Sequence, residues 1–301
     1  MIPSQRVLGV RSRILQSVRG YFYSRGFTEV ETPVRVRTPA LESFIDAEAS
    51  GDSYLRTSPE LHMKRLLCEG YERIFQVGPC FRKGEKGAIH NPEYTMLEWY
   101  RTNADYLDVL VDAKALVATV CKEVLARTEL EYRGFKVEMM PVWDCITVRE
   151  AFAGAAGWDP IRQFDQDRFD TDLVGKVEPG FAAGRPTVLK DFPAEAAALA
   201  RLGGKGEYVY AERWELYAGG MELANAYSEL TDPAEQRERF VKCAEQRRAG
   251  GRPVYKPDES FLKALDKGMP RCAGVALGID RLAMLLSGVE TIAEVRAFAD
   301  E

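Results

Sequence analysis

Apolar side chains recur at helical spacing near the start of the chain. Over residues 7–22 they return every three or four positions, the period of a helix with one buried face, and Gly26 is placed to end that helix. The same period, bounded by capping residues, predicts further helices over 58–70, 104–127 and 232–250.

Two of these helices have clear boundary signals in the sequence. In the first, Ser58 is the expected N-cap, Pro59 opens the first turn and Gly70 lies past the end. In the second, Asp232 is followed by proline, and Gly250 closes the helix.

Strand character appears where apolar residues alternate or cluster between turn residues. The predicted strands cover 27–33, 73–82, 186–193 and 212–230, another strand begins at Tyr94, and the segment 272–286 is expected to pass from a strand into a helix. Gly219 and Gly220 are predicted to form a hairpin turn. The Gly-, Asp- and Arg-rich segment 153–185 is expected to be an irregular or short-helical insertion. No repeat or low-complexity linker divides the chain, so we expect one domain over 1–301.

Composition narrows the class of protein. The 301 residues are 46% apolar and 29% charged, as in a globular domain with ample length for a core. The net charge is −5 and Lys and Arg are spread along the chain, which gives no support for a basic nucleic-acid-binding face. No apolar run approaches the ~20 residues of a membrane helix, and the first residues lack a secretory signal.

Cysteine and histidine usage indicates the compartment. The six cysteines are scattered without a Cys-x-x-Cys pair, and only two histidines are present. We therefore expect reduced thiols, a cytoplasmic location and no zinc site.

The segment "HNPEYTMLEWYR" (90–101) places a carboxylate inside an apolar run. Strand alternation divides its side chains between two faces, Tyr94, Met96, Glu98 and Tyr100 on one, and Thr95, Leu97 and Trp99 on the other. The second face resembles core. The first could be the solvated side of an amphipathic strand. Its aromatic and thioether groups fit better as a cleft wall that stacks a ring and binds an amine.

Two arginines are candidates for contacts with phosphate. Arg82 ends a predicted strand, and His90 follows across a glycine-containing loop. A simple solvated turn is the alternative. Arg281 lies in the first turn of a predicted helix, whose N-terminus favours anions, and Gly278 lets a ligand approach the backbone. An ion pair between Arg281 and Asp280 or another acid is the alternative there.

The segment 215–229 carries Glu215, Glu222, Asn225 and Glu229. Small sets of carboxylates of this kind gather Mg²⁺ around nucleotide phosphates. The last three could instead line the wet face of a helix. The preceding Gly-Gly turn and the aromatic residues favour a strand. Strict alternation then puts Glu222 opposite Asn225 and Glu229, so a shared site requires a bulge.

Taken in this order, the segments resemble the catalytic domain of class II aminoacyl-tRNA synthetases of the lysyl type. "FTEVETP" resembles the first motif of that class, "FR…HNPEYTMLE" the second and "GVALGIDR" the third. "TSPELHMKRLL" and "GGMELANAYSELTD" resemble lysyl-type signatures. The resemblance spans about 7–298. It implies an α+β fold, with a central antiparallel sheet flanked by helices, and a homodimer formed through the first motif.

The chain enters this catalytic domain without an anticodon-binding barrel, and so resembles the truncated elongation factor P–(R)-β-lysine ligase family. "TMLEWYR" agrees, as does Ala276 where lysyl synthetases have glycine. In the ligase family this methyl group shifts preference from α-lysine towards β-lysine, and one methyl supplies about 1–3 kcal/mol. The resemblance implies ATP-dependent activation of (R)-β-lysine or lysine as an adenylate with release of pyrophosphate. The adenylate is then transferred to a lysine ε-amine of elongation factor P. Transfer to tRNA is not expected.

The resemblance also implies roles for individual residues. Arg82 on the α-phosphate and Arg281 on the γ-phosphate are the expected catalytic residues, and Tyr94 is expected to stack on adenine. The expected ATP-binding residues are Arg82, Glu85, His90, Asn91, Tyr94, Glu222, Leu223, Gly278 and Arg281. The expected substrate-binding residues are Ser58, Pro59, Glu60, Glu98, Tyr100, Asn225, Glu229 and Ala276. Glu215 and Glu222 are expected to hold Mg²⁺.

Two departures from the family pattern leave alternatives open. Both families have Arg-Asn-Glu in the second motif, whereas this chain has Arg82, Lys83 and Gly84 before Glu85. Either Glu85 takes over the contact with the adenine amine, or ATP binding is weakened. Ser228 is more typical of the tRNA synthetases.

Other functions therefore remain candidates. They are tRNA charging, a non-catalytic adenylate-binding regulatory module and an asparagine-synthetase-like enzyme. A pocket lined with carboxylates disfavours the acidic substrate of the last.

Overall fold

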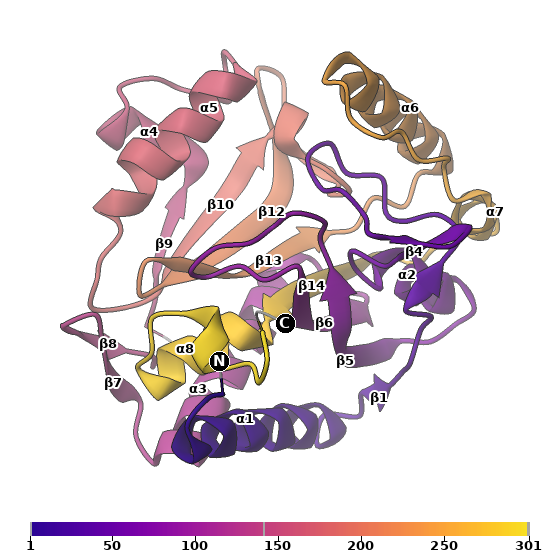
Figure 1. Cartoon of the computed structure of the whole chain (residues 1–301). Helices are drawn as coiled ribbons and strands as arrows, with labels where there is room; N and C mark the ends of the chain where they lie inside the picture. Colours follow the sequence, from indigo (N-terminus) through magenta and orange to yellow (C-terminus); the bar gives the residue numbers. More distant parts are fainter. Residues whose placement is uncertain (1, 141, 300–301) are drawn as a thin grey trace.

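The computed structural model describes residues 2–140 and 142–299, and a nine-stranded mixed sheet organises them (Figure 1). Its strands are β1 (Thr28–Glu29), β5 (Arg73–Phe81), β6 (Glu93–Thr102), β9 (Asp144–Thr147), β10 (Thr187–Pro193), β11 (Leu202–Lys205), β12 (Tyr208–Ala218), β13 (Met221–Ser228) and β14 (Cys272–Gly278). The strand order is β1-β5-β6-β14-β13-β12-β10-β9, and β11 pairs with β12.

The pairing is antiparallel across the middle of this sheet. Only the outer pairs, β1 with β5 and β10 with β9, run parallel among the described strands. The predicted α+β fold with a central antiparallel sheet is therefore confirmed, with parallel strands added at both edges.

Helices and two smaller sheets surround the central sheet. The helices are α1 (Gln5–Tyr23), α2 (Glu60–Cys68), α3 (Tyr106–Leu125), α4 (Val148–Ala155), α5 (Gln166–Asp172), α6 (Pro233–Ala249), α7 (Glu259–Asp266) and α8 (Ile279–Ser287). Shorter helical turns are η1 (Leu173–Val177), η2 (Glu178–Gly180), η3 (Ala194–Ala196) and η4 (Ile292–Glu294). The smaller sheets are β2 (Arg35–Val36), β4 (Ser53–Leu55) and β3 (Ala49–Ser50), and the hairpin of β7 (Glu129–Tyr132) and β8 (Phe135–Glu138).

The main core lies between the sheet and helices α1, α3 and α8 (Figure 1). The predicted apolar face of α1 is buried in it, and the Phe22 ring stacks on Phe75 of β5 with centroids 4.7 Å apart. A second apolar cluster joins α2, α6 and α7, and a third joins α4 and α5 to β10 and β12. The other face of the middle strands is left open between these two clusters.

Most predicted elements are confirmed, with shifts at their ends. The helices predicted over 104–127 and 232–250 are α3 and α6, and the predicted insertion contains α5, η1 and η2. The strand predicted over 27–33 is wrong for most of its length, because only β1 pairs with the sheet.

Helix α2 begins one residue later than predicted. Pro59 stands at the N-cap position, so Ser58 is not the N-cap. The Ser58 hydroxyl nevertheless accepts a hydrogen bond from the Glu60 amide at 3.0 Å, which supplies the expected satisfaction of a helix-end donor.

The prediction of one domain over 1–301 takes in residues 1, 141, 300 and 301, which lie outside the described residues, and it stays a prediction. Among the helices that the structure describes, none is long and apolar enough to cross a membrane.

The hairpin turn between β12 and β13 is confirmed at Gly219 and Gly220, with φ values of 60° and 72°. Both values favour glycine. A Cβ atom on Gly219 would lie 2.7 Å from Cδ1 of Tyr132, whereas one on Gly220 would meet only a guanidinium nitrogen of Arg133 at 3.9 Å. The two positions therefore share backbone strain but differ in packing.

We expect Gly220→Ala to lower the free energy of unfolding by about 1–2 kcal/mol, from backbone strain alone. Gly219→Ala should cost a further ~1–3 kcal/mol, because its methyl group overlaps a buried ring. Urea unfolding of both variants measures the difference. Equal losses in the two variants would show that the turn can move away from Tyr132.

Candidate active site

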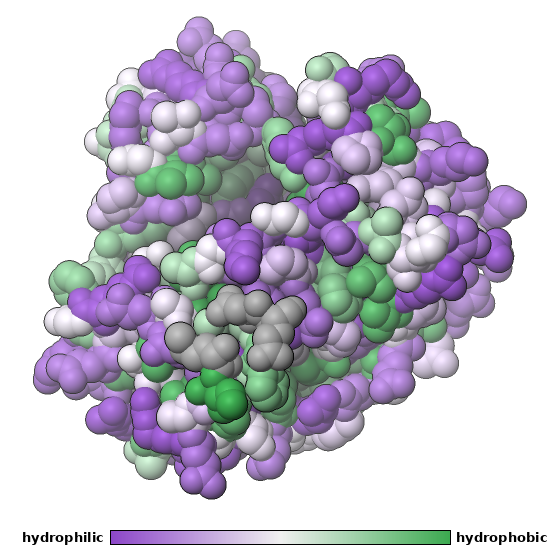
Figure 2. All heavy atoms as spheres, in the orientation of Figure 1, coloured by the Kyte–Doolittle hydropathy of each residue, from purple (hydrophilic) through white to green (hydrophobic). Residues whose placement is uncertain are grey.

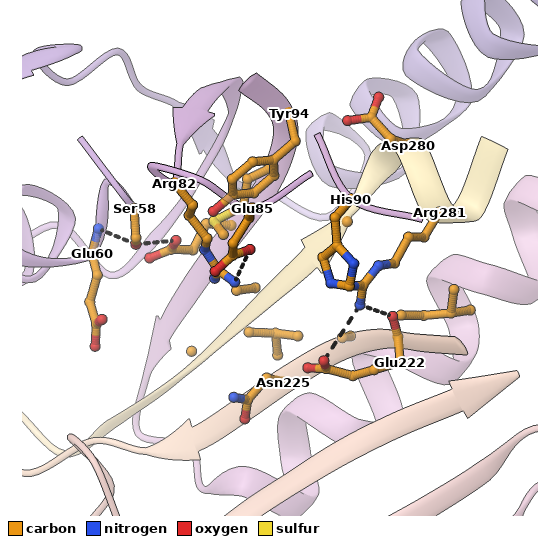
Figure 3. Close-up of a pocket in the computed structure, with 18 of the residues that line it drawn as sticks. Ser58, Glu60, Arg82, Glu85, His90, Tyr94, Glu222, Asn225, Asp280 and Arg281 are labelled. Atoms are coloured by element: carbon orange, nitrogen blue, oxygen red, sulfur yellow. Dashed lines mark hydrogen bonds and ion pairs between the residues drawn. The ribbon is translucent and has the colours of Figure 1, made fainter. Parts of the chain in front are cut away.

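A pocket opens on the face of the sheet opposite the main core, over β6, β14 and β13 (Figure 3). It is lined by Ser58, Glu60, Arg82, Glu85, His90, Asn91, Tyr94, Glu98, Tyr100, Glu222, Leu223, Asn225, Glu229, Ala276, Gly278 and Arg281 from the sequence-predicted set. Pro59 and Glu215 of that set do not line it. Pro59 is at the start of α2, and Glu215 borders an adjoining cleft.

The structure adds lining residues that the sequence did not reveal. They include Glu42, Ile89, Ala224, Tyr227, Val275, Asp280 and Ile292. Tyr227 stands two positions after Asn225 on the same strand, so strand alternation predicts that both side chains share one face. Glu42 comes from an irregular loop, and no periodicity marks it.

Strand β6 behaves as its alternation predicts. Tyr94, Met96, Glu98 and Tyr100 line the pocket, while Leu97 and Trp99 are fully buried in the core. These residues line a pocket, so the predicted cleft wall is present, whereas its stacking on a ring and its binding of an amine stay predictions.

A β-bulge brings Glu222 to the same side as Asn225 and Glu229. Leu216 of β12 pairs with Ala224, but the next residue, Tyr217, pairs with Glu222, so Leu223 is the extra residue in β13. The segment is a strand and not a helix, and the bulge required by strict alternation is present.

Three carboxylates gather at the end of the pocket formed by α2, β6 and the residue that follows β13. Glu98 accepts hydrogen bonds from the hydroxyls of Ser58, at 2.8 Å, and Tyr100, at 2.5 Å. Glu60 and Glu229 both form ion pairs with Lys64, whose Nζ lies 2.6 Å from Oε1 of Glu60. Lys64 is fully buried one turn after Glu60 on α2.

This burial leaves the carboxyl groups poorly stabilised as anions. Burial and the neighbouring Glu60 charge raise the pKa of Glu98 to about 8, although the bonds from Tyr100 and Ser58 oppose the rise. Burial likewise raises the pKa of Glu229 to about 7, against the opposing charge of Lys64. Burial alone would lower the pKa of Lys64, but Glu229 and Glu60 outweigh it and hold the pKa above its ordinary value. An added cation in this space would relieve the carboxylates.

His90 and Arg281 lie at the opposite end of the pocket, and Arg82 lies between them and the side of Ser58 and Glu60 (Figure 3). Arg82 follows β5 and lies 3.6 Å from Glu85 and 5.2 Å from the ring centroid of Tyr94. Arg281, in the first turn of α8, donates to the Glu222 carbonyl at 2.6 Å and lies 2.7 Å from Nε2 of His90. Burial and the Arg281 charge lower the pKa of His90, which favours a neutral ring that can accept this bond.

Arg281 does not pair with its neighbour Asp280. Asp280 lies 2.5 Å from Arg11 of α1 and accepts a bond from the Thr95 amide at 2.7 Å. Arg281 instead reaches the Glu222 carboxylate at 3.5 Å. Its guanidinium is therefore held at the pocket, and Asp280 ties α8 to α1 and β6.

The loop of the second motif brings Glu85 into the pocket despite the altered sequence. Gly84 has a φ of +78°, and the Glu85 amide donates to the Arg82 carbonyl at 3.3 Å, which closes a tight turn. Asn91 is buried and donates to the Glu93 carbonyl at 2.7 Å. The loop is also tied to the C-terminal turn, because the Ile292 amide donates to the Ala88 carbonyl at 2.7 Å.

Glu215 and Glu222, the carboxylates expected to hold Mg²⁺, supply too few ligands to bind the ion without others. Burial and the nearby Glu222 charge raise the pKa of Glu215, while Arg213 lowers it. Glu215 also accepts a bond from the Tyr217 hydroxyl at 2.5 Å. Within 2–140 and 142–299, no group of three or more His, Cys, Asp or Glu side chains is arranged to hold a metal ion. Two repelling carboxylates nevertheless suit Mg²⁺, which takes its remaining ligands from phosphate and water.

Comparisons with known proteins match almost the whole chain. The family model of tRNA synthetases class II (D, K and N) matches residues 3–301. A lysine–tRNA ligase of Chromohalobacter salexigens is 37% identical over 98% of this chain, which spans 64% of that relative's length. Elongation factor P–(R)-beta-lysine ligases of Proteus mirabilis and Photorhabdus laumondii are 40% and 39% identical over 96% of this chain and 93% of their own length.

The raised pKa of Glu98 predicts a pH-dependent stability. The folded protein holds a proton on Glu98 up to about pH 8, whereas the unfolded chain releases it near the ordinary value of 4.5. Without substrate, the free energy of unfolding should therefore fall as pH rises between these values. We expect a shallower fall in Glu98→Gln, measured by urea unfolding across this range. Glu207→Gln, at an exposed turn residue, should keep the wild-type slope. An unchanged slope in Glu98→Gln would contradict the shift.

Proposed function

Because the chain belongs to the class II tRNA synthetase family of the D, K and N types, we propose that it is an ATP-dependent ligase that activates (R)-β-lysine or lysine. The adenylate forms when the substrate carboxylate attacks the α-phosphate of ATP, with release of pyrophosphate. The activated acyl group then passes to a lysine ε-amine of elongation factor P.

The observation that carries the proposal is the cluster of Glu60, Glu98 and Glu229 around Lys64. Once cations in the pocket hold all three carboxylates ionised, the carboxylates and the single Lys64 ammonium group leave two negative charges to be neutralised at this end of the pocket. A diamino acid brings two ammonium groups, so it neutralises the cluster. Aspartate or asparagine lacks the second cation, which disfavours the asparagine-synthetase-like alternative.

The basic end of the pocket suits ATP. Arg82 would contact the α-phosphate and Arg281 the γ-phosphate, with His90 beside it. Tyr94 would stack on adenine, and Glu85 would accept from its exocyclic amine. Asn225 would orient the substrate carboxylate. No side chain acts as nucleophile, so catalysis rests on alignment and neutralisation of charge.

We propose that Glu215 and Glu222 hold Mg²⁺ when ATP is bound. The ion would neutralise charge on the phosphates. Arg281 lies 3.5 Å from the Glu222 carboxylate. The γ-phosphate bound by Arg281 and the Mg²⁺ bound by Glu222 would therefore be neighbours. Bound ATP would therefore rearrange the Arg281–Glu222 pair.

The acceptor is assigned from the relatives. Relatives at 40% and 39% identity are named elongation factor P–(R)-beta-lysine ligases, and we propose the same acceptor for this chain. Ser228, which differs from the ligase pattern, is fully buried and accepts a bond from the Tyr106 amide at 2.9 Å. Its place in the core gives no support for tRNA charging. We further propose that the enzyme acts as a homodimer through the first motif.

The first test is ATP–pyrophosphate exchange with (R)-β-lysine, L-α-lysine, L-aspartate and L-asparagine. We expect exchange with the two diamino acids and none with the acidic substrate or its amide. Exchange that favours α-lysine, together with tRNA acylation in a filter assay, would support tRNA charging instead. A folded protein without exchange for any of them would support an adenylate-binding module.

Ala276 provides a second test. It pairs with Glu98 on β6 and with Asn225 on β13, so its methyl group stands on the pocket face between the two. Ala276→Gly should shift the kcat/KM ratio towards α-lysine by at least tenfold, since one methyl group is worth about 1–3 kcal/mol. The matched variant is Ala226→Gly, which loses a methyl group on the core face of β13 and should leave the ratio unchanged. A shift in both variants, or in neither, would contradict the role of Ala276.

A further inference from the structure

Glu42 lines the pocket and also a second cavity, a broad cleft beside it. The cleft runs between α5, the loop 41–45 and α6, and Figure 2 shows the molecule hollowed between the lobes that carry α5 and α6. Arg82, Glu222, Asn225 and Tyr227 border both cavities as well. The cleft therefore opens directly onto the place where the adenylate would form.

The backbone of Glu42 is fixed in place by a buried arginine. Arg247 of α6 is fully buried, and its guanidinium donates to the carbonyls of Glu42 at 2.6 Å, Ile45 at 2.8 Å and Pro253 at 2.7 Å. It also pairs with Asp46. These bonds use only the main chain of Glu42, so they hold the residue at the cavity boundary without occupying its carboxylate.

The other carboxylates at the pocket are already engaged. Glu60 and Glu229 are bound by Lys64, and Glu98 by two hydroxyls. Glu85 pairs with Arg82.

Farther along the wall, Glu222 pairs with Arg281, and Asp280 with Arg11. Within the described part of the chain, the Glu42 carboxylate takes part in no hydrogen bond or ion pair. Among the described carboxylates that line the pocket, it is the one without a hydrogen-bonding or ion-pair partner.

The surroundings of Glu42 make it a competent base near neutral pH. Burial raises its pKa to about 7, which the Arg82 charge opposes and the Glu60 and Glu85 charges reinforce. The charged and titratable groups that face it come from different elements, namely Arg82 after β5, Glu60 of α2, Glu85 of the loop, Arg213 of β12 and Tyr227 of β13. A base with a pKa near the working pH transfers protons most effectively.

The proposed function leaves one proton unaccounted for. An acceptor lysine arrives as an ammonium ion, which has no lone pair with which to attack. Resting on that proposed function, we propose that Glu42 takes the proton from the ammonium group of the acceptor as it enters through the cleft. Glu42 lines both cavities, so an ammonium group that moves from the cleft into the pocket would pass its carboxylate.

Atoms and charge balance in this transfer. Glu42 becomes a carboxylic acid, and the free amine forms a C–N bond to the carbonyl carbon of the adenylate. The C–O bond to the phosphate then breaks, and AMP leaves with the electron pair. The second proton of the amine leaves with the collapse of the tetrahedral intermediate, to the phosphate or to water. Glu42 returns its proton to water through the open cleft.

The test separates adenylate formation from transfer. Glu42→Gln keeps the shape of the side chain but removes the base. ATP–pyrophosphate exchange should stay within a few-fold of wild type. Transfer from preformed enzyme–adenylate to elongation factor P, or to n-butylamine as a small charged acceptor, should fall by roughly a hundredfold or more at pH 7.

Hydroxylamine distinguishes loss of the base from a structural defect, because a structural defect would lower its reaction with the adenylate as well. It is largely neutral at pH 7 and needs no base, so hydroxamate formation should be nearly equal in Glu42→Gln and wild type. Transfer to the alkylamine should rise with pH through about 7 and level off in the wild type. In Glu42→Gln it should continue to rise with the deprotonation of the free amine. The matched control is Glu48→Gln, an exposed carboxylate six residues on that lines neither cavity.

The outcomes distinguish the two proposals. Absence of exchange in the wild type would overturn the proposed function. Normal exchange with equal transfer in wild type and Glu42→Gln would overturn the role of Glu42 alone. That role would also be overturned if exchange, hydroxamate formation and transfer all fell together in the variant. Wild-type adenylate that reaches neither elongation factor P nor n-butylamine would overturn the amide-forming step and the base with it.

Discussion

The burial of Glu98, Glu229 and Lys64, with the partly exposed Glu60 paired to Lys64, is the constraint on which the rest of the pocket depends. Charges removed from water cost several kcal/mol each unless they are paired. The fold offsets this cost only in part, through the Lys64 ammonium and the hydroxyls of Ser58 and Tyr100. The raised pKa values of Glu98 and Glu229 measure what remains uncompensated. The carboxylates are therefore electrostatically unfavourable in the folded protein, and the two ammonium groups of the proposed diamino acid would relieve this cost on binding.

The sheet makes this arrangement possible because one of its faces packs in the core and the other lines the pocket. On β6 and β14, alternate residues enter the core and the remainder enter the pocket. Close approach across the strands also limits which residues fit. A Cβ atom on Gly274 would lie 2.2 Å from Cε1 of Tyr100 and 2.8 Å from Oε1 of Glu229. Glycine at this position thus lets the Tyr100 hydroxyl reach Glu98, while the bulge at Leu223 turns Glu222 towards Arg281. Regular pairing assembles the acidic end of the pocket, and the bulge adds Glu222 beside Arg281.

Local pattern was enough to predict most of the frame and much of the pocket. Periodicity located α1, α3, α6 and β6, and parity predicted a bulge in β13 on the condition that Glu222, Asn225 and Glu229 share one site. The resemblance to class II synthetases, which the family match confirms, supplied the roles. What pattern missed depends on contacts far apart in the sequence. Lys64 looks like an ordinary helical lysine until Glu229 is placed against it. Glu42 lies on a loop whose shape is set by Arg247, some two hundred residues away. The short pairing of β1 is likewise decided by β5 and not by the residues of "FTEVETP".

The proposed acyl transfer gives a reason for the placement of the two kinds of acidic group. A substrate that is bound and activated needs partners fixed before it arrives, and strands and helices supply them with little freedom. A nucleophile that enters later needs a group at the open side, which the sheet cannot provide because that side faces the cleft. A loop can provide it if its main chain is fixed. Arg247 does this by using its donors on carbonyl oxygens and Asp46, so the Glu42 carboxylate remains available. The two buried cations therefore have different effects on the acidic side chains. Lys64 forms ion pairs with two carboxylates, whereas Arg247 bonds the main chain of Glu42 and leaves its carboxylate without a partner.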